Sequence, residues 1–309
     1  ESLLPSYHYR HFKHWTWAQM QSGQGNQSGD WFEVEPELIN KADPDCVWRT
    51  KEVTRDGKKI TLHQMWSPVK AMVIFMKLHL PLRTYQVRML DSGEADTWRY
   101  EKGQWKLNNK HDFALGSEKR PFGKGIFRRI HDTMTGQFSI GLYVNTNKTA
   151  DQNKSELERG YIIPWQNEEV LYWLEKLRNW QEKYNPIAKP TDCTTLQTKH
   201  TGSAKSQAQL ESMAETTFLF RDASSKGEDK YKPICGAGAL ASFWYQLMLT
   251  LENQLAEQGN TLDNGERLKL VVDYPEDTKK VATNFPLHSL RVSLITAYTM
   301  DTQLPLPVI

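Results

Sequence analysis

The stretch Leu80-Pro81-Leu82-Arg83-Thr84-Tyr85-Gln86-Val87-Arg88-Met89-Leu90 decides the expected fold, because it joins two kinds of sequence pattern. Before it, residues 68–80 form an apolar run of helical length, and Pro68 suits the first turn of a helix. After it come short alternating segments separated by Gly, Asn and Asp, which are typical of strands and turns. Arg83 therefore stands at the end of an apolar helix, just before a region of strands.

Four short segments after this stretch have the composition of strands and are bounded by turn-forming residues. They are residues 97–100, 104–107, 139–144 and 160–163. Because they are short, alternating and separated by turns, we expect them to form one small antiparallel sheet. Residues 168–184 then predict an amphipathic helix that is capped by Asn167 and ended by Asn185-Pro186.

A second motif, Pro286-Leu287-His288-Ser289-Leu290-Arg291-Val292-Ser293, lies near the other end of the sequence. It follows a long predicted helix at about residues 238–257, and it opens a further helix on which Leu287, Leu290 and Leu294 share one stripe. His288 and Arg291 have the i, i+3 spacing of side chains that lie side by side on a helix. The pair suits a phosphate, since arginine offers a bidentate fork and histidine exchanges a proton near neutral pH.

Residues 1–66 differ in composition from the rest, and we expect them to be an N-terminal extension or insertion, with residues 67–309 forming the main domain. They open with an aromatic and basic run at 7–15 and continue with a Gln-, Ser- and Gly-rich stretch at 21–29. His8, His11 and His14 are evenly spaced, but no carboxylate or cysteine accompanies them, so we expect no metal there. A packed helix is the simpler interpretation of this run, and contact with a DNA backbone is the alternative.

The overall composition sets only broad limits. The chain has 309 residues, is 39% hydrophobic and carries a formal net charge of +2, which is too small to indicate nucleic-acid binding by itself. Its longest apolar run, residues 71–76, is far shorter than the ~20 residues that cross a bilayer. The three cysteines form no C-x-x-C pair. We expect a cytoplasmic protein without membrane association, disulfide or zinc site.

The order of these motifs resembles that of the tyrosine recombinases, the phage-integrase family. In that family an arginine follows a leucine at a helix end, as Arg83 follows Leu82, and a lysine lies on a hairpin between two strands, as Lys148 does in Thr146-Asn147-Lys148-Thr149. A strand similar to R-x-I-P-L then leads into a helix, as residues 160–164 lead into 168–184.

The family's H-x-L-R-x-S box completes the resemblance, which covers residues 67–309. The box is matched by His288, Leu290, Arg291 and Ser293. One departure is Gln86, which stands where the family usually has an acidic residue. A second departure is that the family's nucleophilic tyrosine should follow Ile309, so we expect a C-terminally incomplete catalytic domain that is inactive alone.

The resemblance implies an α+β, mainly helical catalytic domain with a small antiparallel sheet. It also implies a site-specific DNA recombinase or integrase that cleaves and rejoins strands through a phosphotyrosyl intermediate, with no metal or other cofactor. Arg83 and Arg291 would clamp the phosphate, Lys148 would bind it and protonate the leaving 5′-oxygen, and His288 would assist proton transfer on the attacking side.

The resemblance makes double-stranded DNA the expected partner, bound by a tetramer of the protein. The setting would be the bacterial cytoplasm, at the nucleoid, as part of a mobile genetic element. Two alternatives remain open at this stage. One is a catalytically inactive DNA-binding regulator or accessory protein on the same fold, and the other is a helical scaffold protein in which the motif matches arise by chance.

Overall fold

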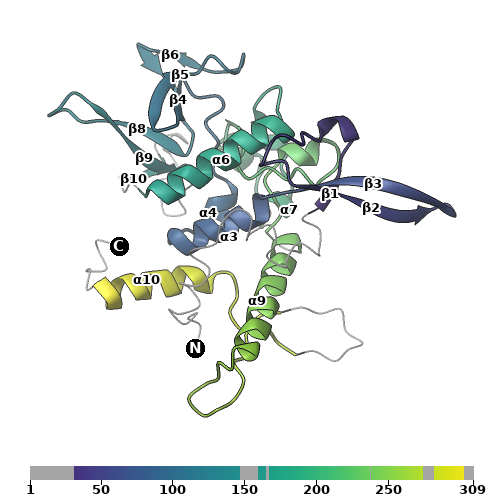
Figure 1. Ribbon diagram of the computed structural model, residues 1–309. Helices are drawn as coiled ribbons and strands as arrows, with labels where there is room; N and C mark the ends of the chain where they lie inside the picture. Colours follow the sequence, from purple (N-terminus) through teal and green to yellow (C-terminus); the bar gives the residue numbers. More distant parts are fainter. Residues whose placement is uncertain (1–30, 147–158, 165–166, 237, 274–281, 303–309) are drawn as a thin grey trace. The chain divides into compact units, whose positions relative to one another are not determined.

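The computed structural model describes residues 31–146, 159–164, 167–236, 238–273 and 282–302 (Figure 1). The chain divides into two compact units. Unit 1 comprises residues 1–84 and 236–309, and unit 2 comprises residues 85–235. The chain leaves unit 1 at Thr84 and returns to it at Gly236, so the sequence of unit 2 interrupts that of unit 1.

A three-stranded antiparallel sheet opens the described part of unit 1. It contains β1 (Trp31–Glu33), β2 (Trp48–Arg55) and β3 (Lys58–Trp66) in the order β1-β3-β2, and the 3-10 helix η2 (Pro36–Leu38) lies between β1 and β2 in the chain. The β2–β3 hairpin turns at Asp56 and Gly57, whose φ angles are 52° and 74°. An Asp-Gly pair is favoured there because both positions need a left-handed backbone. The role of residues 1–66 as an extension or insertion stays a prediction.

Three helices complete the described part of unit 1. They are α3 (Val69–His79), α9 (Ala239–Glu257) and α10 (Ser289–Thr302), and α3 packs against both of the others. The predicted bounds of α3 and α9 are confirmed to within a residue or two, and α10 confirms the helix that was predicted, without a stated end, from the motif at residues 286–293.

Every residue of α3 is buried, including three that carry a titratable or charged group. Lys77 has no exposed area, and its Nζ donates a hydrogen bond to the carbonyl of Leu82 at 3.1 Å. Burial, and then the positive charge of Arg291, lowers the pKa of Lys77 to about 8. The end of α3 therefore carries a cation that is held inside the protein.

Unit 2 combines short antiparallel strands with one long helix (Figure 1). Two of its sheets are the pairs β4 (Trp98–Glu101) with β5 (Gln104–Leu107) and β6 (Gly116–Ser117) with β7 (Arg120–Pro121). A three-stranded sheet in the order β10-β9-β8 contains β8 (Phe127–His131), β9 (Phe138–Val144) and β10 (Tyr161–Ile163). β11 (Thr191–Asp192) pairs with β12 (Glu215–Thr216).

The long helix of unit 2 is α6 (Glu168–Tyr184), and its bounds match the predicted ones. The Asn167 side chain accepts a hydrogen bond from the Val170 amide at 3.1 Å, which confirms the predicted N-cap. The remaining helical segments of the described chain are short: α4 (Thr84–Arg88), α7 (Thr198–Thr201), α8 (Gln207–Glu211), η3 (Cys193–Thr195) and η4 (Gly227–Tyr231).

The expected mainly helical, tyrosine-recombinase-like fold with one small antiparallel sheet is wrong. Of the described residues, 34% are helical and 24% are in strands, so the fold is α+β without a clear helical majority. The strands expected to share one sheet fall into two, because the β4–β5 hairpin closes at Lys102-Gly103 and pairs with no other strand of the described residues. The β1-β3-β2 sheet of unit 1 was not expected at all.

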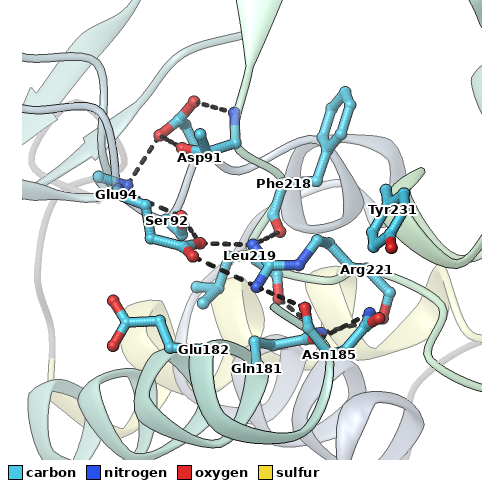
Figure 2. A network of polar contacts seen from close by, with 12 residues as sticks. Asp91, Ser92, Glu94, Gln181, Glu182, Asn185, Phe218, Leu219, Arg221 and Tyr231 are labelled. Atoms are coloured by element: carbon cyan, nitrogen blue, oxygen red, sulfur yellow. Dashed lines mark hydrogen bonds and ion pairs between the residues drawn. The ribbon is translucent and has the colours of Figure 1, made fainter. Parts of the chain in front are cut away.

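A buried polar network connects three segments of unit 2 (Figure 2). Its centre is the ion pair between Arg221 and Glu94, neither of which has any exposed side-chain area. Arg221 also donates to the carbonyls of Phe218 and Asn185, each at 3.2 Å. Nearby, Asp91 accepts hydrogen bonds from the Thr217 amide at 2.8 Å and its hydroxyl at 2.7 Å. The turn at residues 91–96 is thereby attached to the end of α6 and to residues 217–221.

Removing one member of this buried pair should destabilise unit 2 strongly. We expect Arg221→Met to lower the free energy of unfolding by about 3 to 5 kcal/mol, because it leaves the Glu94 carboxylate charged and unpaired in a buried site. Adding Glu94→Gln should recover part of the loss, which urea denaturation of the single and double variants would measure. Lys106→Met, in an ion pair whose lysine is 52% exposed, is the control and should cost under about 1 kcal/mol. Equal losses in Arg221→Met and Lys106→Met would contradict the prediction.

The depressed pKa of Lys77 predicts a pH dependence of stability. The Lys77 ammonium group binds its proton less tightly in the folded state, where its pKa is about 8, than in the unfolded state, where its pKa is 10.5. Below pH 8 the lysine is charged in both states, and burial of this charge lowers the free energy of unfolding by about 3 kcal/mol. That cost disappears as the pH rises from 8 to 10.5. The unfolding free energy of the natural protein, minus that of Lys77→Met, should therefore rise by about 3 kcal/mol across this range. A difference that stays constant with pH would show that Lys77 does not titrate there.

Candidate functional site

Arg83 lies just after α3, in unit 1, where the chain runs through Leu80-Pro81-Leu82. The helix ends with Leu80 in an extended conformation, and Leu80 and Leu82 are buried. The bond from Lys77 to the Leu82 carbonyl fixes this segment from inside. Arg83 itself is half-buried, so its side chain stands at the edge of the core.

His288 and Arg291 belong to the start of α10, in the same unit. Of the predicted stripe, Leu290 and Leu294 are buried and Leu287, which precedes the helix, is half-buried, while His288 is exposed and Arg291 is half-buried. The Nε of Arg291 donates a hydrogen bond to the carbonyl of Pro81 at 2.8 Å. This bond places the first turn of α10 directly beside the segment that leads to Arg83.

The electrostatics of His288 show that four basic side chains gather here. Its pKa lies below the ordinary histidine value, first because the surrounding protein removes part of its water and then because of the positive charges of Lys77, Arg291 and Arg83. We call these four residues the basic cluster. His288 is consequently neutral at neutral pH and can accept a proton, while Lys77, Arg83 and Arg291 supply positive charge.

Lys77 is the member of the basic cluster that the sequence did not suggest. It lies within an apolar helix, where a lone lysine resembles an occasional surface position. The sequence did contain a sign that Lys77 is buried. The residues around it, from Met72 to Leu80, are mostly apolar on every face of the helix, so no face is suited to contact with water. A lysine inside such a helix needs a buried acceptor, which the carbonyl of Leu82 provides.

Lys148, the fourth predicted catalytic residue, lies outside the described residues. The chain on either side of it is described, in unit 2. Gln86 on α4 donates from Nε2 to the Thr146 carbonyl at 3.0 Å and to the Tyr161 hydroxyl at 3.3 Å. Gln86, which stands where the family usually has an acidic residue, thus connects α4 to both ends of the segment that joins β9 to β10 and contains Lys148.

The described residues contain one group of side chains with the composition of a metal site. Ligand atoms of Glu94, His111 and Glu182 lie within 4.8 Å of one another. Burial by itself raises the pKa of Glu182, but hydrogen bonds from His111, Arg99 and Lys110 hold it well below the ordinary range. Glu94 is paired with Arg221. Since both carboxylates already face cations, the group is better described as part of an ion-pair network.

The basic cluster has the chemistry of a phosphate site. Two guanidinium groups can share the non-bridging oxygens of a phosphodiester, and they stabilise the extra negative charge of a pentavalent transition state. The bond from Arg291 Nε to Pro81 uses one of its five donors and fixes the direction of its fork. No helix in the described part of the chain is both long and apolar enough to span a membrane.

Comparison with known proteins gives one result. The family model described as "Putative integrase" matches residues 2–194, which include Arg83 and Lys148 but neither His288 nor Arg291. No curated protein and no solved structure matches the chain. Because the matched region covers more than half of the sequence, the chain belongs to this integrase family, which indicates a role in DNA integration or recombination with DNA as its partner.

Proposed function

We propose that the protein is a site-specific recombinase of a bacterial mobile element, which cleaves and rejoins DNA strands through a phosphotyrosyl intermediate. The observation that carries the proposal is the gathering of Lys77, Arg83, His288 and Arg291 at one place in unit 1. Membership in an integrase family supports DNA as the molecule that supplies the phosphate.

In this mechanism a tyrosine oxygen attacks the scissile phosphorus, and the bond between phosphorus and the 5′-oxygen breaks. His288 accepts the tyrosine proton, which its lowered pKa favours at neutral pH. Arg83 and Arg291 hold the non-bridging oxygens, and Lys148 donates a proton to the leaving 5′-oxygen. Tyr298 is not assigned as the nucleophile, because it lies on α10 itself, only about two helical turns beyond Arg291.

Lys77 has a supporting role in the proposed site. It is fully buried, so it does not touch the phosphate, but its charge adds to the positive potential at Arg291 and His288. Burial makes such a charge act over a longer distance than an exposed one, because water does not screen it.

The two arginines should each contribute one phosphate contact to DNA binding. We expect Arg83→Ala and Arg291→Ala to weaken duplex affinity, and each should reduce the slope of log affinity against log salt by about 1. Fluorescence anisotropy with a labelled duplex at several salt concentrations measures both effects. Arg267→Ala is the matched control, because this exposed arginine already pairs with Glu252 and should leave the slope unchanged. Equal slopes in all three variants would contradict the proposed site.

Strand cleavage separates the recombinase from a DNA-binding regulator. In a polypeptide that includes the nucleophilic tyrosine, a nicked duplex that traps the covalent intermediate should give a protein–DNA adduct, and His288→Gln should slow its formation. With a lowered histidine pKa, the rate should be constant at neutral pH and fall only below the ordinary histidine range near 6.5, when His288 becomes protonated. Binding that depends on Arg83 and Arg291 without any adduct would instead identify a regulator on the same fold.

A further inference from the structure

Unit 2 contains an open cavity that the proposed reaction does not use. It lies between the β4–β5 hairpin and the β8–β9 strands and has a volume of about 160 Å³. Trp98, Trp105 and Phe138 contribute rings to its wall, and Arg128 and Arg129 contribute guanidinium groups. Sites for whole cofactors or drug-sized ligands usually measure about 300 to 1,000 Å³, so this one suits a single ring system.

The register of the hairpin explains why aromatic rings line the cavity. Trp98 pairs with Leu107, and Tyr100 pairs with Trp105, so alternation along the strands puts all four side chains on one face. The Tyr100 ring stacks on Phe127 of β8 with centroids 5.5 Å apart. The aromatic face of the hairpin is therefore turned toward β8, and the cavity lies beside this contact.

Two arginines with unused hydrogen-bonding capacity stand in the wall. The Arg129 guanidinium lies 3.9 Å from the ring centroid of Trp98 and 3.4 Å from that of Phe138, while Arg128 lies 3.9 Å from the ring centroid of Tyr143. The Nε atoms of both arginines are buried without a hydrogen-bond partner. Among the residues that the structure describes, no carboxylate lies within ion-pair distance of either of them, and the charges of Asp96 and Glu118 act on Arg128 and Arg129, respectively, from farther away. The cavity therefore offers positive charge together with flat aromatic surface.

The remaining polar group of the wall, Asp96, is already engaged. Its carboxylate accepts hydrogen bonds from the backbone amides of Lys124, at 2.8 Å, and Gly125, at 3.0 Å. Lys124 is also engaged, because its Nζ donates to the Met213 and Glu215 carbonyls and to the Thr216 hydroxyl. Asp96 and Lys124 therefore already use their hydrogen-bonding groups within the protein, so ligand binding in this cavity depends on ring stacking and on positive charge.

We propose that this cavity binds one unpaired nucleotide of the DNA substrate. Its base stacks on the indole of Trp105, and its phosphate contacts the guanidinium groups of Arg128 and Arg129. Stacking on aromatic side chains accepts any base, so the aromatic wall does not select one base over another. The inference rests on the proposed function, because strand exchange exposes unpaired nucleotides next to the cleaved site.

The test uses the full chain with a labelled single-stranded oligothymidine, and a fully paired duplex in parallel. Oligothymidine should quench the intrinsic tryptophan fluorescence, and Trp105→Ala should weaken its binding about tenfold. Trp105→Phe should retain most of the affinity, because it preserves a stacking ring. Phe138→Ala removes a ring that is 45% exposed and should weaken binding without disturbing the core. Tyr172→Ala, at a 58% exposed tyrosine on α6, is the matched control and should bind normally.

The outcomes separate this inference from the proposed function. If oligothymidine does not bind, or binds equally to the natural protein, Trp105→Ala and Phe138→Ala, the inference is overturned even where duplex binding depends on Arg83 and Arg291. If oligothymidine binding depends on Trp105 while duplex binding ignores both arginines, the cavity is supported and the proposed phosphate site fails. Circular dichroism of each variant establishes that the fold is retained.

Discussion

The buried ion pair between Arg221 and Glu94 is the contact on which the arrangement of unit 2 depends. Its two residues are 127 positions apart in the sequence, and neither is exposed to water. A charge left unpaired in such a place costs several kcal/mol, so the turn at 91–96 and the strand-like segment at 217–221 are stable only together. The same turn holds the amides of Lys124 and Gly125 through Asp96, just before β8. The turn also leads directly into β4. The β4–β5 hairpin and the β8–β9 strands, which form the two walls of the cavity, are therefore both attached to this turn.

Local patterns predicted the helices well but did not predict how the strands pair. α6 matches its predicted bounds because Asn167, the apolar stripe and Asn185-Pro186 are all signals within the helix or at its ends. The two strands of the β4–β5 hairpin were also expected, yet the separation of this hairpin from β8–β9 depends on where the chain goes after Leu107, which periodicity does not encode. The β2–β3 hairpin could have been predicted, because Asp56-Gly57 between two extended runs is a strong turn signal.

The candidate site, like the fold, was predicted only in part from the sequence. Arg83, His288 and Arg291 were predicted from short motifs, and the structure brings these three together in unit 1. Their catalytic roles, like that of Lys148, stay predictions. Lys77 could not be assigned, because the burial of a lysine depends on which helices pack around it. Asp91, Glu94 and Asp96 received no prediction from the sequence, yet all three are buried and held by partners from distant segments.

The hydrogen bond from Arg291 to Pro81 joins residues that are 210 positions apart, with the whole of unit 2 between them in the sequence. During synthesis on a ribosome, the segment that carries Arg83 emerges early, but the first turn of α10 emerges only after unit 2 has been made. The basic cluster therefore cannot assemble on a partly made chain. A polypeptide interrupted anywhere before His288 would lack half of the proposed phosphate clamp, so the order of the sequence itself delays the appearance of this site until translation has passed unit 2.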